Sequence, residues 1–464
     1  MPPGLPRPAE ATMLAAEEPG GFMRYWLSTP ARLVPLAFLL VIAIGTTLLM
    51  LPIAQAEPGQ TPFLTALFIA TSAVAVTGLS VVDTAQHWSS FGHVTIFMLF
   101  QIGGVGIMTF STLLVILLSR KLSLSHQIIV TTESRGIVLG DVRAVLKLAL
   151  AVMIGVELLV AMVMLPHFMS RGLALPQAAW QALFNAAAAF TNAGFSTYPG
   201  GMASFISDPL ILTSIMFAVL IGGLGLPVYY DLQQAPRADK RLSLHSKLTL
   251  VTTLALYLLT FVLTASFEWT NERTLGALSV TDRLVNAAYH GFMARSCGMN
   301  TLDMVAIREE TLLTTFGLMM IGGGSASTAG GIKVSTLAIL LLAVWHEVRG
   351  NTDLTAFGRR VSPVVQREAL TVLVLAFAVL FVGVMALRLL TDLPLRQVVF
   401  EAISAFANVG LSMNATPLMP PAAQVVLIAL MFLGRVGTIT IGVALALRHR
   451  RANFRYPEER PIVG

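Results

Sequence analysis

The sequence is short of charge and of cysteine. Charged residues make up 12% of its 464 positions, about half of the roughly 25% that a soluble domain carries. The single cysteine, Cys297, excludes an internal disulfide framework and a zinc site built on several cysteines. With so little charge to form a solvated surface, the 55% of residues that are hydrophobic become the main guide to the fold.

Several apolar runs are long enough to cross a bilayer, which takes about 20 residues. They are Leu33–Pro52, Val94–Leu118, Leu146–Leu165, Leu210–Tyr230, Leu248–Phe267, Leu312–Leu342, Leu370–Leu390 and Val425–Leu447. These runs predict an all-α integral membrane protein with many spans. The first run is long enough to span and has no small-residue cleavage site after it, so we expect no cleaved signal peptide.

Basic residues flank the apolar runs unevenly. Most of them follow the second, fourth, sixth and eighth runs, as Arg120, Arg241 and Arg359 do. The positive-inside rule then places these segments and both termini in the cytoplasm. The net charge of +6 therefore reflects orientation and does not indicate a nucleic-acid partner. We expect a disordered tail at 1–26, which is rich in Pro, Ala and Glu, and a cytoplasmic tail at 448–464.

A short polar motif built around a glycine recurs four times. The stretches VTGLS, TNAGFS, SCGMN and ANVGLS carry these glycines at intervals of about 110 residues, namely Gly78, Gly194, Gly298 and Gly410. A second marker follows each one about 25 residues later, as QIGGVG, LIGGLG, MIGGGS and FLGRVG. Two markers in register predict four internal repeats, with units at 27–140, 141–243, 244–357 and 358–447.

A shorter amphipathic segment precedes each glycine motif. These segments are Phe63–Val76, Gln177–Thr191, Val280–Ala294 and Leu395–Ala407. They are too short to span a bilayer and fit re-entrant half-helices. Non-helical backbone at membrane depth must line a water-filled cavity or be buried in protein. We therefore predict four helix–pore-helix–helix repeats in a pseudo-fourfold arrangement around a central pore.

An alternative is that the motif glycines only let helices pack closely. That alternative does not explain the polar residues beside them, which are Thr77, Asn192, Ser296 and Asn408.

The motif chemistry favours a monovalent cation. A half-helix entering from outside points its C-terminal end, with partial negative charge, toward the membrane centre. Carbonyl oxygens of the following loop can replace the hydration shell of an ion, and glycine permits the backbone dihedrals that this requires. No ring of acidic residues accompanies the motifs. The predicted selectivity filter comprises Val76, Thr77, Gly78, Asn192, Ala193, Gly194, Ser296, Cys297, Gly298, Asn408, Val409 and Gly410.

The stretch GGGSASTAGGIK interrupts the second long helix expected in the third unit. Each glycine disfavours a helix by about 1 kcal/mol relative to alanine, so we expect a break and a loop below the filter. A nucleotide-binding loop needs Lys directly after its second glycine and then Ser or Thr, a pattern that Gly331-Ile332-Lys333 does not match. We therefore expect no nucleotide on this chain.

Arg435 stands where the other second markers have Gly104, Gly223 and Gly323. A charged residue at mid-membrane is costly and functional by default. Arg435 and the glycine-rich loop form our predicted gate, although the arginine could also satisfy loop carbonyls. The gate set is Gly322, Gly323, Gly324, Ser325, Ser327, Thr328, Gly330, Gly331, Lys333 and Arg435.

Three further residues near the motifs or within an apolar run need a role. We expect Arg295 to pair with a carboxylate behind the filter, with Glu401 as a possible partner, in preference to contacting the ion. Glu157 lies within an apolar run and is expected to hydrogen-bond between helices. Cys297 is expected only to pack beside the filter.

These motifs resemble those of the Trk/Ktr/HKT superfamily of potassium transporters over about Leu27 to Arg448, nearly the whole chain. The chain is most similar to the KtrB-type membrane subunits of that superfamily. The resemblance implies K⁺ at the four glycines, an intramembrane gating loop, and a homodimer with one pore per subunit in the bacterial cytoplasmic membrane. It also implies a cytosolic KtrA-like regulatory ring that binds ATP or ADP.

The resemblance leaves the role of Na⁺ open. Plant relatives with serine at the first filter glycine tend to pass sodium, so Gly78 favours potassium. Ala193 and Cys297 beside the filter depart from the family pattern. They leave open how strictly the filter selects potassium over sodium, and sodium stimulation of transport is open as well.

Two other classes fit less well. Inverted-repeat secondary transporters bind substrate at broken helices near the midplane, but the repeats here are parallel and span twice. An intramembrane enzyme would need a converging acid, base or metal set, and the histidines are scattered. We expect a protein that is not an enzyme.

Overall fold

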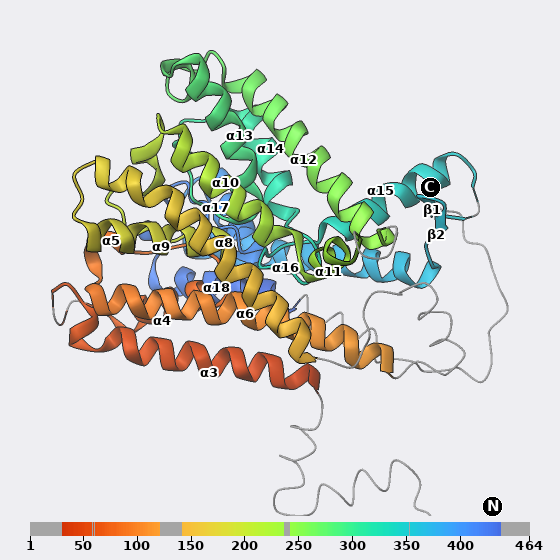
Figure 1. The fold of residues 1–464 in the computed structure, drawn as a ribbon, viewed down its shortest axis with the longest axis horizontal. Helices are drawn as coiled ribbons and strands as arrows, with labels where there is room; N and C mark the ends of the chain where they lie inside the picture. Colours follow the sequence, from red (N-terminus) through yellow and green to blue (C-terminus); the bar gives the residue numbers. More distant parts are fainter. Residues whose placement is uncertain are drawn as a thin grey trace, which may run out of the picture.

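The computed structural model describes residues 30–57, 59, 61–120, 142–235, 242–351 and 353–437. The predicted tails at 1–26 and 448–464 lie outside these residues. The described part is mostly helical (Figure 1), with a small antiparallel hairpin formed by β1 (Thr355–Ala356) and β2 (Arg359–Arg360).

The helices form four groups in chain order. The first holds α3 (Pro30–Met50), α4 (Phe63–Val74), α5 (Thr84–His87) and α6 (Ser90–Arg120). The second holds α8 (Val142–Ser170), α9 (Leu175–Thr191), α10 (Pro209–Leu224) and α11 (Leu226–Gln234). The third holds α12 (Leu244–Glu268), α13 (Val280–Ser296), α14 (Glu309–Met320) and α15 (Val334–Val348). The fourth holds α16 (Pro363–Leu390), α17 (Leu395–Ala407), α18 (Pro421–Phe432) and the π-helical turn η6 (Leu433–Gly437).

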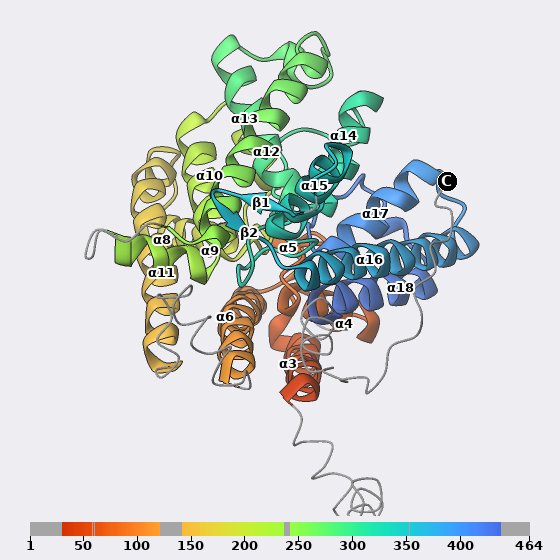
Figure 2. The same ribbon diagram turned by 90° about the vertical axis from the view of Figure 1, so that its right-hand side faces the viewer.

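Packing joins these groups into a closed circuit. Within each group the helices on either side of the short helix pack against it, as α3 and α6 pack against α4. Between groups, α6 packs against α8 and α9, α10 against α13, α14 against α17, and α18 returns to α4. Seen end-on in Figure 2, the groups follow one another around a common centre in chain order. The unit boundaries drawn from the sequence stay a prediction.

The short helices match the predicted half-helix segments, which confirms them as helices. Two of them, α4 and α17, begin directly after a proline at Pro62 and Pro394, and α13 is capped by the side chain of Ser279. Their C-terminal halves are buried, as at Ala186–Ala189 of α9. The apolar small residues of these segments allow the surrounding helices to enclose them.

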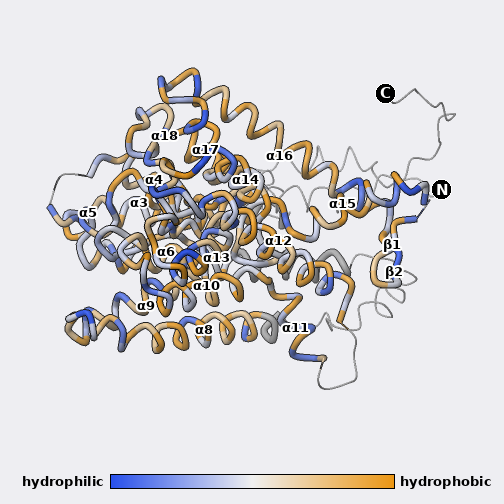
Figure 3. The backbone as a smooth tube through the Cα atoms, turned by 90° about the horizontal axis from the view of Figure 1, so that it is seen from above, coloured by the Kyte–Doolittle hydropathy of each residue, from blue (hydrophilic) through white to orange (hydrophobic). Residues whose placement is uncertain are grey.

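The outer helices carry the apolar surface. Three described helices are long and apolar enough to cross a bilayer, over Leu146–Ser170, Leu244–Glu268 and Pro363–Leu390, and the bent pair α10–α11 is a fourth if it counts as one span. Leucines and phenylalanines on these helices are exposed, including Phe381 and Leu389. Figure 3 shows the long helices as mainly hydrophobic and many of the joining loops as hydrophilic.

Among the described residues, two expected spans are broken, and the sequence predicted only one of these breaks. The expected break in the third unit is confirmed, because α14 ends at Met320 and α15 begins at Val334. The run Leu210–Tyr230 was expected to be one continuous span, and that expectation is wrong. It bends by 91° between α10 and α11 at Gly225, whose φ of 92° and ψ of 155° suit only glycine.

Candidate functional site

The four motif glycines lie next to one another in a closed ring. A Cβ atom placed on any of them would press on a backbone carbonyl oxygen of the next motif, and the last motif meets the first. The distance from this Cβ position to the carbonyl oxygen is 2.6 Å for Gly78 and Ala193, 2.6 Å for Gly194 and Cys297, and 2.5 Å for Gly298 and Val409. Gly410 faces the carbonyl oxygen of Thr77 in the same way. All four glycines have φ between 69° and 92°. Space and dihedrals both require glycine here.

Three of the four motif loops leave their short helix in the same way. The residue two positions before the glycine is left-handed in each, with φ of 56° at Val76, 60° at Asn192 and 53° at Asn408. This conformation is strained for a β-branched residue such as Val76. In the third motif α13 continues to Ser296, and Cys297 stays right-handed. The ring is therefore not strictly symmetric.

Buried side chains tie neighbouring loops together behind the ring. The amide nitrogen of Asn408 donates to the hydroxyl of Thr77 at 2.8 Å, which links the fourth loop to the first. The hydroxyl of Ser296 donates to the amide oxygen of Asn192 at 2.8 Å, which links the third loop to the second. Cys297, the residue after Ser296, is fully buried. The polar residues beside the glycines thus set the positions of the loops.

The second glycine marker has a packing role that the sequence did not reveal. In three units, the marker glycine lies against a carbonyl oxygen near the end of the short helix of the same unit. The pairs are Gly103 with Val74, Gly222 with Phe190, and Gly434 with Phe406. Each of these carbonyls belongs to the residue four positions before the ring glycine. In the third unit Gly322 lies instead against the carbonyl of Gly330, because the helix is broken there. In the first, second and fourth units the marker therefore brings a long helix into backbone contact with the end of the short helix.

The glycine-rich segment Ile321–Lys333 fills the space between the ring and the α10–α11 bend. Its backbone pairs with that bend: the Gly324 amide donates to the Gly223 carbonyl at 2.8 Å, and the Leu226 amide donates to Ala326 at 3.3 Å. A Cβ on Gly330 would press on the carbonyl of Ala407, at the end of α17. The segment is therefore held on two sides by groups two and four.

Thr328 connects this segment to the ring. Its hydroxyl donates to the carbonyls of Phe190 (3.1 Å) and Gly222 (3.0 Å) and accepts a hydrogen bond from the Asn192 amide at 2.8 Å. Ser327 is also buried. A conformational change in the segment would therefore alter the hydrogen bonds of the second motif loop.

Two cationic side chains, the half-buried Lys333 and the buried Arg435, lie near the same segment. Lys333 donates to the carbonyl of Ala329 at 2.7 Å, and Arg435 is buried in η6 with 3% of its surface exposed. The two are close enough for their like charges to interact. In the same segment, the hydroxyl of Ser325 forms a 3.1 Å hydrogen bond with the hydroxyl of Ser335 in α15. The structure thus brings the residues of the predicted gate set together.

The expected pairing of Arg295 with Glu401 is wrong. The Arg295 guanidinium donates to the carbonyl of Gly322 at 2.7 Å and lies 4.5 Å from the centre of the Tyr257 ring. Glu401 accepts instead from the hydroxyls of Ser412 (2.6 Å) and Thr416 (2.5 Å). Arg295 therefore holds the first residues of the glycine-rich segment, and Glu401 orders the loop after the fourth glycine.

The expectation for Glu157 is confirmed. The amide nitrogen of Gln101 on α6 donates to its carboxylate at 2.8 Å. The bond crosses between the first and second groups.

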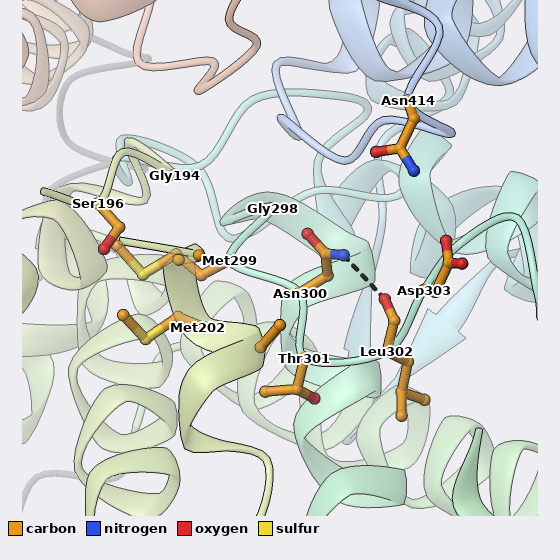
Figure 4. A pocket seen from close by; sticks show the side chains of 13 residues that line it. Gly194, Ser196, Met202, Gly298, Met299, Asn300, Thr301, Leu302, Asp303 and Asn414 are labelled. Carbon is orange, nitrogen blue, oxygen red and sulfur yellow. Dashed lines mark hydrogen bonds between the residues drawn. The ribbon is translucent and has the colours of Figure 1, made fainter. Parts of the chain in front are cut away.

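Sequence reasoning missed a cavity of about 410 Å³ beside the ring (Figure 4). Its wall includes two ring glycines, Gly194 and Gly298, and the loops that follow them up to Gly201 and Asp303. The only signal in the sequence was the polar character of these loops.

Buried short helices, a ring of glycine loops at their ends and apolar outer helices together define a multi-pass membrane transport protein. The sequence matches the family described as "TrkH: Cation transport protein" over residues 25–456. The chain therefore belongs to this family, and the resemblance drawn from its motifs to a membrane subunit of the Trk/Ktr superfamily is confirmed.

Among curated proteins, it is similar to Ktr system potassium uptake protein B of Bacillus subtilis (strain 168), with 36% identity over 94% of this chain and 97% of that protein. It is 33% identical to potassium/sodium uptake protein NtpJ of Enterococcus hirae, over 94% of this chain and 97% of that one. The solved structure of the potassium transporter TrkH from Vibrio parahaemolyticus has the same fold, with a TM-score of 0.65, 18% identity, and coverage of 88% and 84%.

Proposed function

We propose that this chain is the ion-translocating subunit of a bacterial potassium uptake system. Its four helix–pore-helix–helix repeats surround a central pore, and the glycine loops form the selectivity filter. The observation that carries the proposal is the closed ring of Gly78, Gly194, Gly298 and Gly410. Each loop stands at the C-terminal end of a short helix, where the helix dipole favours a cation.

Potassium is the cation that the filter fits best. The twelve residues of the three-residue stretches that end at the ring glycines carry no charge, so ion binding rests on backbone and side-chain oxygens. Such a neutral filter suits a monovalent ion. One relative is named for potassium uptake and another for potassium and sodium uptake. Glycine at position 78 favours potassium, and sodium acts as a second ion or a stimulator.

The glycine-rich segment and Arg435 form the gate below the filter. The segment contacts the ends of α9 and α17 through Thr328 and Gly330, so it lies directly beneath the ring. The charges of the half-buried Lys333 and the buried Arg435 oppose a cation that would pass between them. Opening requires the segment to leave its hydrogen bonds to Gly222 and Gly223.

The subunit works as a homodimer in the bacterial cytoplasmic membrane, with both termini inside. The Ktr name of its relatives favours a cytosolic KtrA-like ring that binds ATP or ADP and moves the gate. The basic hairpin β1–β2 lies at the end of the molecule opposite α5 (Figure 1), as expected for a cytoplasmic face.

The test is growth rescue of a potassium-uptake-deficient bacterium at micromolar potassium, with and without sodium and a KtrA-like partner. We expect rescue that the partner increases. Because a side chain at position 78 would press on the carbonyl of Ala193, Gly78→Ser should distort the first filter loop, admit sodium and reduce the preference for potassium. Gly172→Ser is the matched control, because Gly172 also has a positive φ (89°) but has nothing within 4 Å of its Cβ position. An unchanged preference for potassium over sodium in Gly78→Ser would contradict the assignment of the glycine loops as the selectivity filter.

A further inference from the structure

The cavity beside the ring lies where the loops of the second and third units rise from Gly194 and Gly298. In the orientation proposed above, this is the outer side of the filter. Its volume of about 410 Å³ has room for an ion with a shell of six to eight waters, at about 30 Å³ each. An ion could therefore rest here without losing its hydration shell.

Polar groups line this cavity on several sides. Ser196, Asn300, Asp303 and Asn414 come from three different loops (Figure 4). The Asn300 amide nitrogen donates to the carbonyl of Leu302 at 2.8 Å, which leaves its oxygen free to accept. Hydroxyl and amide oxygens of this kind are suitable partners for the waters around a cation.

Asp303 supplies the charge. It is exposed, and one carboxylate oxygen accepts from the backbone amide of Val305 at 2.9 Å. Within the described ranges, no salt bridge includes Asp303. The acid in the corresponding loop of the second unit, Asp208, is buried and paired with Arg171 at 2.7 Å and with His167. Asp208 is thus paired with a neighbouring arginine, whereas Asp303 has no salt-bridge partner among the described residues and lies at the cavity.

We propose that this cavity is an outer site for a hydrated monovalent cation, with Asp303 as its anionic group. The inference rests on the proposed function. A carboxylate beside a narrow entrance raises the local cation concentration and the rate of capture. Asp303 therefore sets how well the transporter works at low external potassium, while the ring glycines set which ion passes.

The experiment measures potassium uptake by cells that carry the full chain and its regulatory partner. Asp303→Asn should raise the KM about two- to fivefold at about 10 mM ionic strength, with little change in maximal rate, and salt should reduce the difference because it screens the charge. Glu272→Gln is the matched control, since Glu272 is an exposed acid on the loop between α12 and α13 and does not line the cavity. An unchanged KM for Asp303→Asn, or an equal rise for Glu272→Gln, would overturn the inference.

A second variant tests the sign of the charge. The single native cysteine, Cys297, is fully buried, so Asp303→Cys provides one accessible thiol. Modification with an anionic methanethiosulfonate reagent should bring the KM back toward the wild-type value, and a cationic reagent should raise it further. Equal effects of the two reagents would contradict the site. Absence of potassium uptake in the wild type would instead contradict the proposed function itself.

Discussion

Asn408 and Thr77 are 331 residues apart in the sequence and are joined by a 2.8 Å hydrogen bond from the asparagine amide to the threonine hydroxyl. The same amide donates to the carbonyl of Met431 at 3.0 Å. One side chain thus closes the circuit between the last and first motif loops and attaches both to α18. Because all these groups are buried, the bond is screened from water and its loss leaves polar groups unpaired.

We expect Thr77→Val to lower the free energy of unfolding by about 1–2 kcal/mol, because the Asn408 amide loses an acceptor in a buried site. Thr77→Ser keeps the hydroxyl and should have a smaller effect. In a double-mutant cycle with Asn408→Ala, denaturation of the detergent-solubilised protein should give a coupling of about 1 kcal/mol. Strictly additive losses would show that the bond contributes nothing.

Arg295 should act through the glycine-rich segment and not through an ion pair. It donates to the carbonyls of Gly322 at 2.7 Å and Ile321 at 3.5 Å. Arg295→Gln should therefore weaken the fold by about 2–4 kcal/mol and increase rubidium leak through the unregulated protein. Both effects are measured on one preparation, by thermal unfolding and by tracer flux.

The control for this variant is Glu401→Gln. Because Glu401 is hydrogen-bonded to Ser412 and Thr416, neutralising it should not restore Arg295→Gln. If the double variant regained the stability lost in Arg295→Gln, that result would favour an ion pair between Arg295 and Glu401, which the structure contradicts.

The sequence predicted the features that local patterns determine. The positions of the four short helices and the break at the glycine-rich stretch of the third unit follow from apolar periodicity, small residues and clustered glycines. The partner of Arg295 could not be predicted, because it depends on how the glycine-rich segment folds back under the ring. The break at Gly225 was missed because apolar residues continue on both sides of it, although Pro227 is a signal that could have indicated it.

The break at Gly225 should depend on glycine, and the chain offers a matched comparison two residues away. Gly225 has a φ of 92°, and a Cβ there would press on the carbonyl of Ser325, whereas a Cβ on Gly223 would meet nothing within 4 Å. Gly225→Ala should reduce stability by about 1–3 kcal/mol or more. Gly223→Ala lies in α10 and should be neutral or slightly stabilising. Equal unfolding midpoints for the two variants would show that the bend tolerates a side chain.

Arg435 should limit the rate at which cations pass the closed gate. Its charge is buried beside Lys333 and the glycine-rich segment, where the effective dielectric constant is low and a unit charge raises the barrier by about 1–2 kcal/mol. Arg435→Ala should therefore increase rubidium uptake about tenfold in cells without the regulatory partner. Arg435→Lys keeps the charge and should keep most of the barrier. The control is that Arg435→Ala still folds and inserts into the membrane normally. If this variant then passes rubidium no faster than wild type, the arginine supports the loop without obstructing the ion. The gate would in that case consist of the segment Ile321–Lys333 alone.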